Sequence, residues 1–414
     1  MIVSVIGLGY IGLPTAALIA SKGIDVVGVD VDKDIVDTVN EGKIHIIEND
    51  LEGLVHSAVK SGYLTASISP KKSDIFIVAV PTPFMDDHKP DLSFIKSASE
   101  LIARFLESGN LVILESTSPV GTTEKMMEWM KDERPDLSFP TLNSDFKSDI
   151  FIAHCPERVL PGSIIKELVS NDRIIGGMTQ NCSDKAKGFY EQFVQGVCLL
   201  TDSRTAEMSK LVENSFRDVN IAFANELSLI CDKLNINVWD LIKLANHHPR
   251  VDILKPGPGV GGHCIAVDPW FIVDSAPKES KLIQMARAVN DSKPLFVIEK
   301  LIQTLDEFNI IKEEISISCL GLSFKPDIDD LRESPALEIV TKIDQMGFER
   351  VNIVEPNINE LPESLSSSKL VDFNSAIISS DIVLLLVDHF EFKNIDLSLL
   401  SGKHIIDTRG IWSL

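Results

Sequence analysis

The sequence predicts an α/β protein with two doubly wound, Rossmann-like domains, bridged by a long central helix and a further helical segment. Over residues 1–200, short runs rich in Val, Ile and Leu alternate with helical stretches, which is typical of a parallel sheet covered on both faces. A stretch without Gly or Pro follows from 204 to 234. A second alternating pattern begins at residue 315 and predicts a second, smaller α/β domain.

The length of 414 residues exceeds what one hydrophobic core usually organises, so the chain is expected to form several domains. The expected divisions are residues 1–200, 201–300 and 301–414. With 44% hydrophobic and 24% charged residues, the composition is that of a globular protein. The formal net charge of −22 argues against binding to nucleic acid or to an anionic membrane.

Six cysteines are scattered along the chain without a C-x-x-C pair, which fits thiols in a reducing compartment better than a disulfide framework. The apolar amino terminus lacks a basic segment and is interrupted by glycines and a proline, which favours a buried strand and turn over a signal peptide. No apolar run reaches the ~18 residues of a membrane span. We therefore expect a cytoplasmic protein.

The strands are expected where apolar residues run together. Those of the first domain are Ile2–Ile6, Val26–Asp30, Ile75–Val80, Leu111–Glu115 and Ile150–Cys155, and those of the last are Ile315–Leu320, Val351–Val354, Asp381–Val387 and His404–Asp407. One helix of roughly 30 residues is expected from Arg204 to about Leu234, longer than an ordinary globular helix. Its many apolar residues, Phe216 among them, predict that it is largely buried.

The first predicted strand runs directly into Gly7-x-Gly9-x-x-Gly12, which opens a helix. Glycines in this context allow a tight turn and let a pyrophosphate approach the helix N-terminus. Asp30 ends the next predicted strand, where a carboxylate bonds ribose hydroxyls and repels the 2′-phosphate of NADP. NAD is therefore the expected cofactor. A glycine-rich turn that binds nothing is the alternative interpretation.

Two loops rich in Ser and Thr, residues 80–83 and 115–123, also follow predicted strands. Loops at the carboxyl ends of parallel strands line the ligand cleft of such sheets, so these hydroxyls can meet a cofactor or a substrate. The same residues can equally form turns and helix caps.

Cys264 lies in residues 257–268, Gly-Pro-Gly-Val-Gly-Gly-His-Cys-Ile-Ala-Val-Asp. A lone thiol is most often a small buried hydrophobe. The glycines before Cys264 leave its backbone with little cover, and this favours a nucleophile. A zinc site would need ligands from His247, His248, His263 and Cys264, whose spacing is not an established zinc pattern, so no metal is predicted.

Several polar and charged residues are expected to contact a substrate. Lys210, Asn214 and Arg217 share one face of the predicted long helix because they are spaced i, i+4, i+7. Polar groups on a buried helix need partners, which a bound substrate would supply. Residues 324–326 and 330–335 open the second α/β domain, and their cations predict a diphosphate site.

Taken together, these residues resemble the UDP-glucose/GDP-mannose dehydrogenase family. The resemblance covers essentially the whole chain and is carried by the strings AVPTPF, ILESTSPVGTTEKM, CPERVLPG, SRTAEM, ENSFRDVNIAFANELSLIC, NHHPRV, PGPGVGGHCIAVDPWF and FKPDIDDLRESPA. It implies an NAD-dependent enzyme that oxidises the alcohol of a nucleotide sugar to a uronic acid, for surface polysaccharide biosynthesis.

The resemblance implies catalytic roles at matching positions. These positions are Cys264, Lys210, Asn214, Asp268, Thr117 and Glu157. Cys264 would hold the C6 aldehyde as a thiohemiacetal and then as a thioester. Lys210 and Asn214 would stabilise oxyanions and orient the sugar, and the last three residues would position and activate the hydrolytic water.

The resemblance also implies binding residues. For NAD they are Gly7, Gly9, Tyr10, Ile11, Gly12, Asp30, Thr82, Thr123 and Arg332, the last of them at a phosphate. For the nucleotide sugar they are Arg158, Val159, Lys210, Asn214, Arg217, His248, Arg250, Gly261, Phe324, Lys325 and Arg409. His248 and Arg250 would reach into a neighbouring subunit, which makes the helical segment a dimerisation segment and implies a homodimer with a shared active site.

Arg158 after the Pro-Glu pair and His263 before Cys264 match the N-acetylhexosamine branch of the family rather than its glucose-type members. The implied substrate is a UDP-N-acetylhexosamine, foremost UDP-N-acetyl-D-mannosamine, oxidised at C6 to UDP-N-acetyl-D-mannosaminuronate. The same chemistry on UDP-N-acetylglucosamine or UDP-glucose is the alternative. Two more distant interpretations are a two-electron NAD dehydrogenase in which Cys264 is structural, and an NAD-sensing binding protein.

Overall fold

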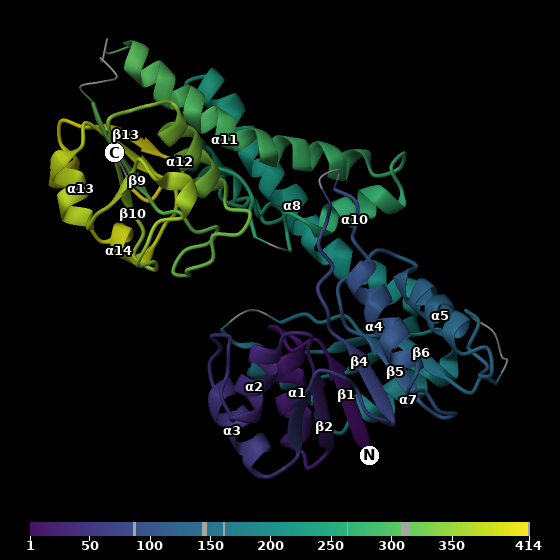
Figure 1. The fold of residues 1–414 in the computed structure, drawn as a ribbon. Helices are drawn as coiled ribbons and strands as arrows, with labels where there is room; N and C mark the ends of the chain where they lie inside the picture. The colour runs from purple at the N-terminus through teal and green to yellow at the C-terminus, as the bar shows by residue number, and fades with distance from the viewer. Residues whose placement is uncertain (86–87, 143–146, 160–161, 263, 308–314, 413–414) are drawn as a thin grey trace. The chain divides into compact units, whose positions relative to one another are not determined.

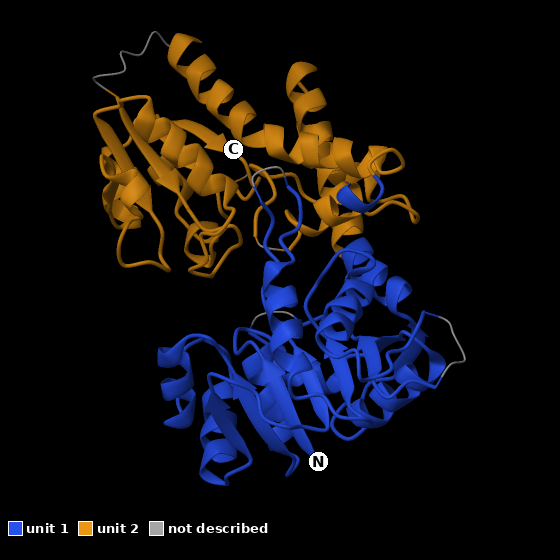
Figure 2. Cartoon of the chain, turned by 45° about the vertical axis from the view of Figure 1, so that its right-hand side comes forward, with its two compact units in different colours: residues 1–213, 274–276 blue, residues 214–273, 277–414 orange. Residues whose placement is uncertain are grey.

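The computed structural model of the protein describes residues 1–85, 88–142, 147–159, 162–262, 264–307 and 315–412. The chain divides into two compact units, coloured separately in Figure 2. The first unit comprises residues 1–213 with 274–276, and the second comprises residues 214–273 with 277–414.

The first unit is built on an eight-stranded sheet (Figure 1). Its elements are β1 (Ile2–Ile6), α1 (Gly12–Ala20), β2 (Asp25–Val29), α2 (Lys33–Asn40), α3 (Leu51–Lys60), β3 (Leu64–Ser67), β4 (Ile75–Val78), α4 (Ser93–Ala103), β5 (Leu111–Leu114), α5 (Thr122–Glu133), β6 (Phe151–His154), α6 (Ile164–Ser170), β7 (Arg173–Gly177), α7 (Gln180–Tyr190) and β8 (Cys198–Asp202). The strand order is β3-β2-β1-β4-β5-β6-β7-β8, and neighbouring strands are parallel except β6 and β7.

The two central strands of this sheet, β4 and β5, are apolar at every position and buried on both faces. In β4, Ile75 and Ile77 pack into one hydrophobic core, whereas Phe76 and Val78 pack into the other. Alternating side chains of one strand therefore pack into two different cores, because successive side chains of a strand point to opposite faces of the sheet. The carboxyl ends of the parallel strands remain as the edge at which ligands bind in doubly wound sheets.

The antiparallel pairing of β6 and β7 departs from the expected parallel order. Ala153 pairs with Gly177 and His154 with Gly176. This register means that the chain leaves β6 and enters β7 at the same edge of the sheet, the carboxyl end of β6. The loop that begins with Glu157 is thereby kept at the ligand edge.

The long helix α8 (Ser203–Lys233) has 31 residues and confirms the predicted helix. It begins in the first unit and continues into the second. The expectation that it is largely buried is wrong for this chain, because Phe216 is 71% exposed and Phe223 53% exposed. Apolar periodicity reports an apolar face but does not say whether the same chain covers it.

The second unit holds a five-stranded parallel sheet in the order β11-β10-β9-β12-β13. Besides most of α8, its elements are α9 (Val238–Ala245), α10 (Asp268–Ser275, whose last two residues belong to the first unit), α11 (Lys281–Glu307), β9 (Ser316–Leu320), α12 (Pro335–Gln345), β10 (Arg350–Val354), η1 (Glu363–Leu365), β11 (Lys369–Leu370), α13 (Phe373–Ser379), β12 (Ile382–Leu385), α14 (Phe390–Lys393), η2 (Leu397–Leu400) and β13 (His404–Asp407). The chain order reverses between β9 and β12, which is the switch point where ligands bind in such sheets.

The predicted fold class, two doubly wound sheets joined through a long helix, is confirmed. The sequence reading missed the strands β3, β7, β8 and β11. These strands are polar, glycine-containing or partly exposed, so they lack the apolar runs that mark the central strands. The expected ends of the other strands differ from the observed ones by a few residues at most.

Candidate active site

The glycine turn between β1 and α1 is shaped to receive a dinucleotide. A Cβ on Gly7 would lie 2.6 Å from the carbonyl oxygen of Ala79, and a Cβ on Gly12 would overlap the carbonyl oxygen of Gly7. A Cβ on Gly9, in contrast, would meet no heavy atom of the described residues within 4 Å. The turn therefore needs two glycines for its own packing and leaves open space over the third, where a pyrophosphate approaches the helix N-terminus.

Asp30 stands at the carboxyl end of β2 and is oriented by the turn. Its Oδ2 accepts a hydrogen bond from the backbone N–H of Leu8 at 2.9 Å, and its Oδ1 accepts one from the N–H of Asp32 at 3.0 Å. Each carboxylate oxygen retains a lone pair for a ribose hydroxyl. Tyr10 is exposed and Ile11 half-buried at the start of α1. These residues fit NAD.

We expect Gly9→Ala to weaken NAD binding by about tenfold or more while leaving the protein folded, because the new methyl group occupies only the space over the turn. Gly12→Ala should instead lower the melting temperature, since its methyl group overlaps the backbone of Gly7. Fluorescence titration with NADH and thermal unfolding separate the two effects. Wild-type affinity in Gly9→Ala would show that no pyrophosphate lies over this residue.

The predicted hydroxyl contacts lie at the carboxyl ends of β4 and β5. The Thr82 hydroxyl is buried and has no hydrogen-bond partner within the described part of the chain. The Thr123 hydroxyl is fully buried and donates to Glu207 of α8 at 2.6 Å. Glu207 also accepts from the backbone N–H groups of Gly121 and Thr123, so it caps the start of α5. Thr123 thus has a capping role, and its contact with NAD stays a prediction.

Glu157 is held in a buried group of charges at the carboxyl edge of the first sheet. Arg173, at the start of β7, donates from Nη2 to Glu157 Oε2 at 2.7 Å and from Nη1 to Glu115 Oε1 at 3.3 Å. Tyr190 donates its hydroxyl to the same oxygen of Glu115 at 2.6 Å. The Arg173 guanidinium lies 4.5 Å from the centre of the Tyr190 ring. Two carboxylates therefore share one buried cation.

Burial raises the pKa of Glu115 to about 7, an effect that Glu157 reinforces and Arg173 opposes. Burial works against the charged form of Arg173, yet Glu157 and its other anionic neighbours raise the pKa of Arg173 above its ordinary value. Arg173 therefore stays charged, and Glu115 carries the exchangeable proton near neutral pH. The Glu157 carboxylate is oriented by a fixed cation on one side and by the N–H of Arg158 at 2.7 Å on the other.

The loop after Glu157 is anchored at both ends. Arg158 forms a two-pronged ion pair with Glu213 of α8, with distances of 2.6 and 3.1 Å. At the far end, Glu48 accepts from the N–H groups of Gly162 and Ile164 at 2.7 and 2.9 Å. Val159 is half-buried between these anchors. Thr117 is half-buried just beyond the carboxyl end of β5.

Cys264 is exposed in the turn that precedes α10, and its carbonyl oxygen accepts from the N–H of Asp268 at 2.8 Å. Asp268 is 3% exposed and accepts from Nδ2 of Asn214 at 2.5 Å. The structure therefore brings three of the predicted catalytic residues onto neighbouring elements of the second unit. Lys210 is half-buried and, like Thr117 and Glu157, belongs to the first unit.

The loop that leads to Cys264 is fixed by packing and by buried amides. Gly262 has a φ of +84°, and a Cβ there would lie 2.8 Å from the Phe324 ring; a Cβ on Gly261 would overlap the Glu333 carbonyl oxygen. The N–H of Gly257 donates to Asn225 of α8 at 2.8 Å. His263 lies outside the described residues. The glycines are therefore needed because the loop lies directly against the Phe324 segment.

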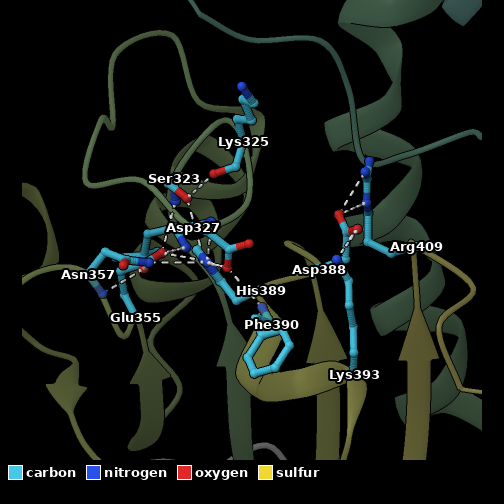
Figure 3. A network of polar contacts seen from close by, with 11 residues as sticks. Ser323, Lys325, Asp327, Glu355, Asn357, Asp388, His389, Phe390, Lys393 and Arg409 are labelled. Atoms are coloured by element: carbon cyan, nitrogen blue, oxygen red, sulfur yellow. Dashed lines mark hydrogen bonds and ion pairs between the residues drawn. The ribbon is translucent and has the colours of Figure 1, made fainter. Parts of the chain in front are cut away.

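Two of the residues predicted to bind the nucleotide, Lys325 and Arg409, follow strands of the second sheet at its carboxyl edge (Figure 3). Phe324 and Lys325 follow β9, and Arg409 follows β13. Arg409 pairs with Asp388 at 2.8 Å, and although burial opposes it, Arg409 and Lys393 hold the pKa of Asp388 below its ordinary value. Together with Pro258 and Gly259, these segments line a small pocket at the switch point.

The remaining residues predicted to bind NAD or the nucleotide sugar have more exposed side chains. Arg217, His248 and Arg250 have exposed side chains in the second unit. Arg332 lies in the same unit and pairs with Asp330 at 2.7 Å. No cluster of metal-binding side chains occurs among the described residues, and none of the described helices is long and apolar enough to cross a membrane.

Sequence reasoning missed the residues that hold the candidates in place, chiefly Glu115, Arg173, Glu207, Glu355 and His389. Each acts across a long sequence separation, for example 75 positions between Glu115 and Tyr190. A local pattern carries no sign of such a pairing. The one available signal was that carboxylates follow buried strands, as Glu115 and Glu355 do.

Comparisons with known proteins match all three parts of the chain to one family. Models of the UDP-glucose/GDP-mannose dehydrogenase family match it with the NAD binding domain over residues 1–194, the central domain over 204–292 and the UDP binding domain over 318–414. A UDP-N-acetyl-D-mannosamine dehydrogenase of Campylobacter jejuni is 60% identical over 394 residues, 94% of this chain and 96% of that protein.

Two further similar proteins are named for two different sugars. An NDP-N-acetyl-D-galactosaminuronic acid dehydrogenase of Ralstonia nicotianae is 57% identical over 99% of this chain and 96% of its own length. The solved UDP-N-acetyl-mannosamine dehydrogenase of Staphylococcus aureus is 42% identical, with a TM-score of 0.84 over 100% of this chain and 96% of that one. The chain belongs to the UDP-glucose/GDP-mannose dehydrogenase family, a family of NAD-dependent nucleotide-sugar dehydrogenases, and its cofactor is NAD.

Proposed function

We propose that the protein oxidises the C6 alcohol of UDP-N-acetyl-D-mannosamine to the carboxylate of UDP-N-acetyl-D-mannosaminuronate. The observation that carries the proposal is the exposed Cys264 in the turn before α10, whose first residue, Asp268, accepts a hydrogen bond from Asn214. All three residues lie in the second unit, and residues 318–414 of that unit match a UDP binding domain. One alcohol, two NAD⁺ and one water give one carboxylate, two NADH and three protons. The product would serve surface polysaccharide biosynthesis.

The glycine turn and Asp30 would hold NAD, which would supply the hydride acceptor for the two oxidations at C6. Lys210 and Asn214 orient the sugar and stabilise the alkoxide that forms when the alcohol proton leaves to solvent, as one of the three protons released. The Cys264 sulfur then adds to the aldehyde carbon and gives a thiohemiacetal, so the aldehyde stays bound between the oxidations.

The second oxidation converts the thiohemiacetal to a thioester, and water completes the reaction. The water attacks the acyl carbon, the C–S bond breaks and the thiolate of Cys264 is restored. Glu157, oriented by Arg173, takes the proton of the attacking water, and Thr117 and Asp268 position that water. Asp268 is suited to positioning because its carboxylate is buried and bonded to Asn214.

The binding roles are proposed on the same basis. Gly7, Gly9, Tyr10, Ile11, Gly12, Asp30, Thr82, Thr123 and Arg332 contact NAD; Arg158, Val159, Lys210, Asn214, Arg217, His248, Arg250, Gly261, Phe324, Lys325 and Arg409 contact the nucleotide sugar. The turn around Gly9 and the pocket beside Phe324 and Arg409 support these two groups respectively.

The relatives suggest two configurations for the sugar. The mannosamine assignment is supported by the Campylobacter jejuni relative at 60% identity. The Ralstonia nicotianae relative, named for N-acetyl-D-galactosaminuronic acid and 57% identical, makes a galacto-configured substrate the second candidate. UDP-N-acetylglucosamine and UDP-glucose, the alternatives from the sequence, complete the set to be tested.

The test is a comparison of kcat/KM with these four UDP sugars at saturating NAD. We expect the manno sugar to exceed each of the others by about tenfold or more, which corresponds to about 1.4 kcal/mol of transition-state binding. A preference for the galacto sugar would change the proposed substrate and leave the proposed reaction unchanged. No turnover with any of them would refute the proposed function.

We propose a homodimer with a shared active site, built on the exposed apolar side of α8. Phe216, Phe223 and Ile230 follow one another at seven-residue spacing and are 71%, 53% and 47% exposed. This spacing places them along one side of the helix. An exposed apolar stripe of this kind favours burial against another copy of the chain.

We expect the double change Phe216→Glu with Phe223→Glu to convert the dimer to monomers, because each carboxylate would have to be buried without a partner. Light scattering coupled to size exclusion measures the mass directly. Lys60→Glu, on α3 of the first unit, is the control for added negative charge and should remain dimeric. A wild-type protein that runs as a monomer, or a double variant that stays dimeric, would contradict this interface.

Two further assignments complete the proposal. The division into domains 1–200, 201–300 and 301–414 is supported by the limits of the three family models. A cytoplasmic location is supported by the cysteines, all six of which are thiols in the structure.

A further inference from the structure

The loop of residues 323–327 carries Phe324 and Lys325 and depends on residues outside it for several of its hydrogen bonds. It follows β9 at the switch point of the second sheet. Two residues that follow other strands contact its ends, namely Glu355 after β10 and His389 after β12 (Figure 3). Lys325 is exposed, and its side chain points away from this network in Figure 3.

Glu355 anchors the start of the loop. Its Oε2 accepts from the backbone N–H groups of Leu322 and Ser323 at 2.7 and 3.1 Å. Its Oε1 accepts from the backbone N–H of Asn357 at 3.1 Å. Although burial opposes ionisation, the hydrogen bonds from His389 and Leu322 hold the pKa of Glu355 at about 2. Glu355 is therefore an anion near neutral pH, and it directly follows β10.

His389 anchors the end of the loop and is fully buried. The backbone N–H of Asp327 lies 2.9 Å from Nδ1, and since an N–H can only donate, Nδ1 must accept. Nε2 lies 3.0 Å from Glu355 Oε2, so the ring hydrogen sits on Nε2 and is donated to that carboxylate. His389 is thus a neutral imidazole in one fixed tautomer.

The bond to Asp327 matters because this residue is strained. Asp327 has a φ of +63°, a conformation that non-glycine residues adopt at a cost. Its N–H is held by His389, and its carboxylate accepts from the N–H of Phe390 at 2.8 Å. Ser323 closes the loop from within by donating its hydroxyl to the carbonyl of Lys325 at 2.8 Å.

We propose that His389, supported by Glu355, is a positioning residue that sets the 323–327 loop for the diphosphate and base of the nucleotide. It acts through the acceptor at Nδ1, which fixes Asp327 and with it the direction of Phe324 and Lys325. Loss of that acceptor lowers the affinity for the nucleotide and leaves the thiol chemistry intact. The inference rests on the proposed function, in which this loop binds the UDP moiety.

Substitution of His389 by asparagine or by glutamine distinguishes the roles of its two ring nitrogens. The side-chain oxygen of asparagine falls near the position of Nδ1, and the side-chain amide of glutamine reaches toward that of Nε2. His389→Asn can therefore still accept from Asp327, whereas His389→Gln can still donate to Glu355 but no longer accepts from Asp327. Calorimetric titration of each full-length variant with UDP, and separately with NAD, compares them.

We expect His389→Gln to bind UDP about tenfold more weakly than wild type and His389→Asn to stay within about threefold, the range for one hydrogen bond. The affinity for NAD should be unchanged in both. With the UDP sugar, His389→Gln should raise KM and keep kcat.

Equal UDP affinity in the two variants, whether at the wild-type value or equally reduced, would overturn the inference, since the effect would not follow the acceptor at Nδ1. Failure of the wild-type protein to bind UDP would overturn the proposed nucleotide site and this inference with it. The two failures are thus distinguishable in one experiment.

Discussion

Cys264→Ser is expected to stop formation of the uronate, with a fall in steady-state rate on the order of 10³ or more. A serine hydroxyl at this exposed turn adds to an aldehyde poorly, and an ester would hydrolyse more slowly than a thioester. The variant should therefore release at most one NADH per sugar. Quenched single-turnover reactions with product identification by mass measure both quantities.

The control for Cys264→Ser is Cys198→Ser, which alters another thiol, on the edge strand β8 of the first unit. It should retain wild-type stoichiometry because Cys198 has no place in the proposed chemistry. A full two NADH per sugar from Cys264→Ser would mean that the thiol is structural. A two-electron dehydrogenase would then be the better description.

Arg173→Met is expected to lower the free energy of unfolding by about 3–5 kcal/mol, the usual loss when one partner of a buried ion pair is removed. Glu115 and Glu157 would face each other without their shared cation. Urea unfolding monitored by fluorescence measures the loss. Lys72→Met, which breaks the exposed ion pair with Glu107, should cost less than about 1 kcal/mol. Equal losses in the two variants would contradict the account of this cluster.

The same cluster predicts a pH dependence of stability. The folded state keeps the Glu115 proton up to a pKa of about 7, whereas an unfolded chain releases it near the ordinary 4.5. Stability from this group is therefore fully present below pH 4.5 and is lost as the pH rises through about 7. Glu115→Gln, which cannot ionise, should flatten the fall in unfolding free energy between these pH values. Parallel curves for the variant and wild type would refute the assignment.

The sequence was informative where the chemistry is local. The dinucleotide turn was predicted from Gly7, Gly9, Gly12 and Asp30, because the glycines of a tight turn and a carboxylate at a strand end are close together in the sequence. The strings around Cys264 and Phe324 predicted the family, which the comparisons confirm. The central strands were equally clear because burial on both faces demands unbroken apolar runs.

The rest depended on pairings that only the folded chain creates. Arg173 sits at the start of a strand that lacks an apolar run, and nothing near it in sequence points to Glu115 or Glu157. The hydroxyl of Thr123 donates to Glu207 of α8, 84 positions away, and no local pattern indicates that pairing. Phe216 was expected to be buried, and it lies open on α8 because helical periodicity cannot distinguish a core from an interface.

The most direct test of the account is to count NADH released per UDP-N-acetyl-D-mannosamine consumed by the wild-type protein, with the product identified by mass spectrometry. We predict two NADH per sugar and a product that carries a carboxylate at C6, with no free aldehyde. One NADH per sugar together with an accumulating aldehyde would contradict the central role of Cys264.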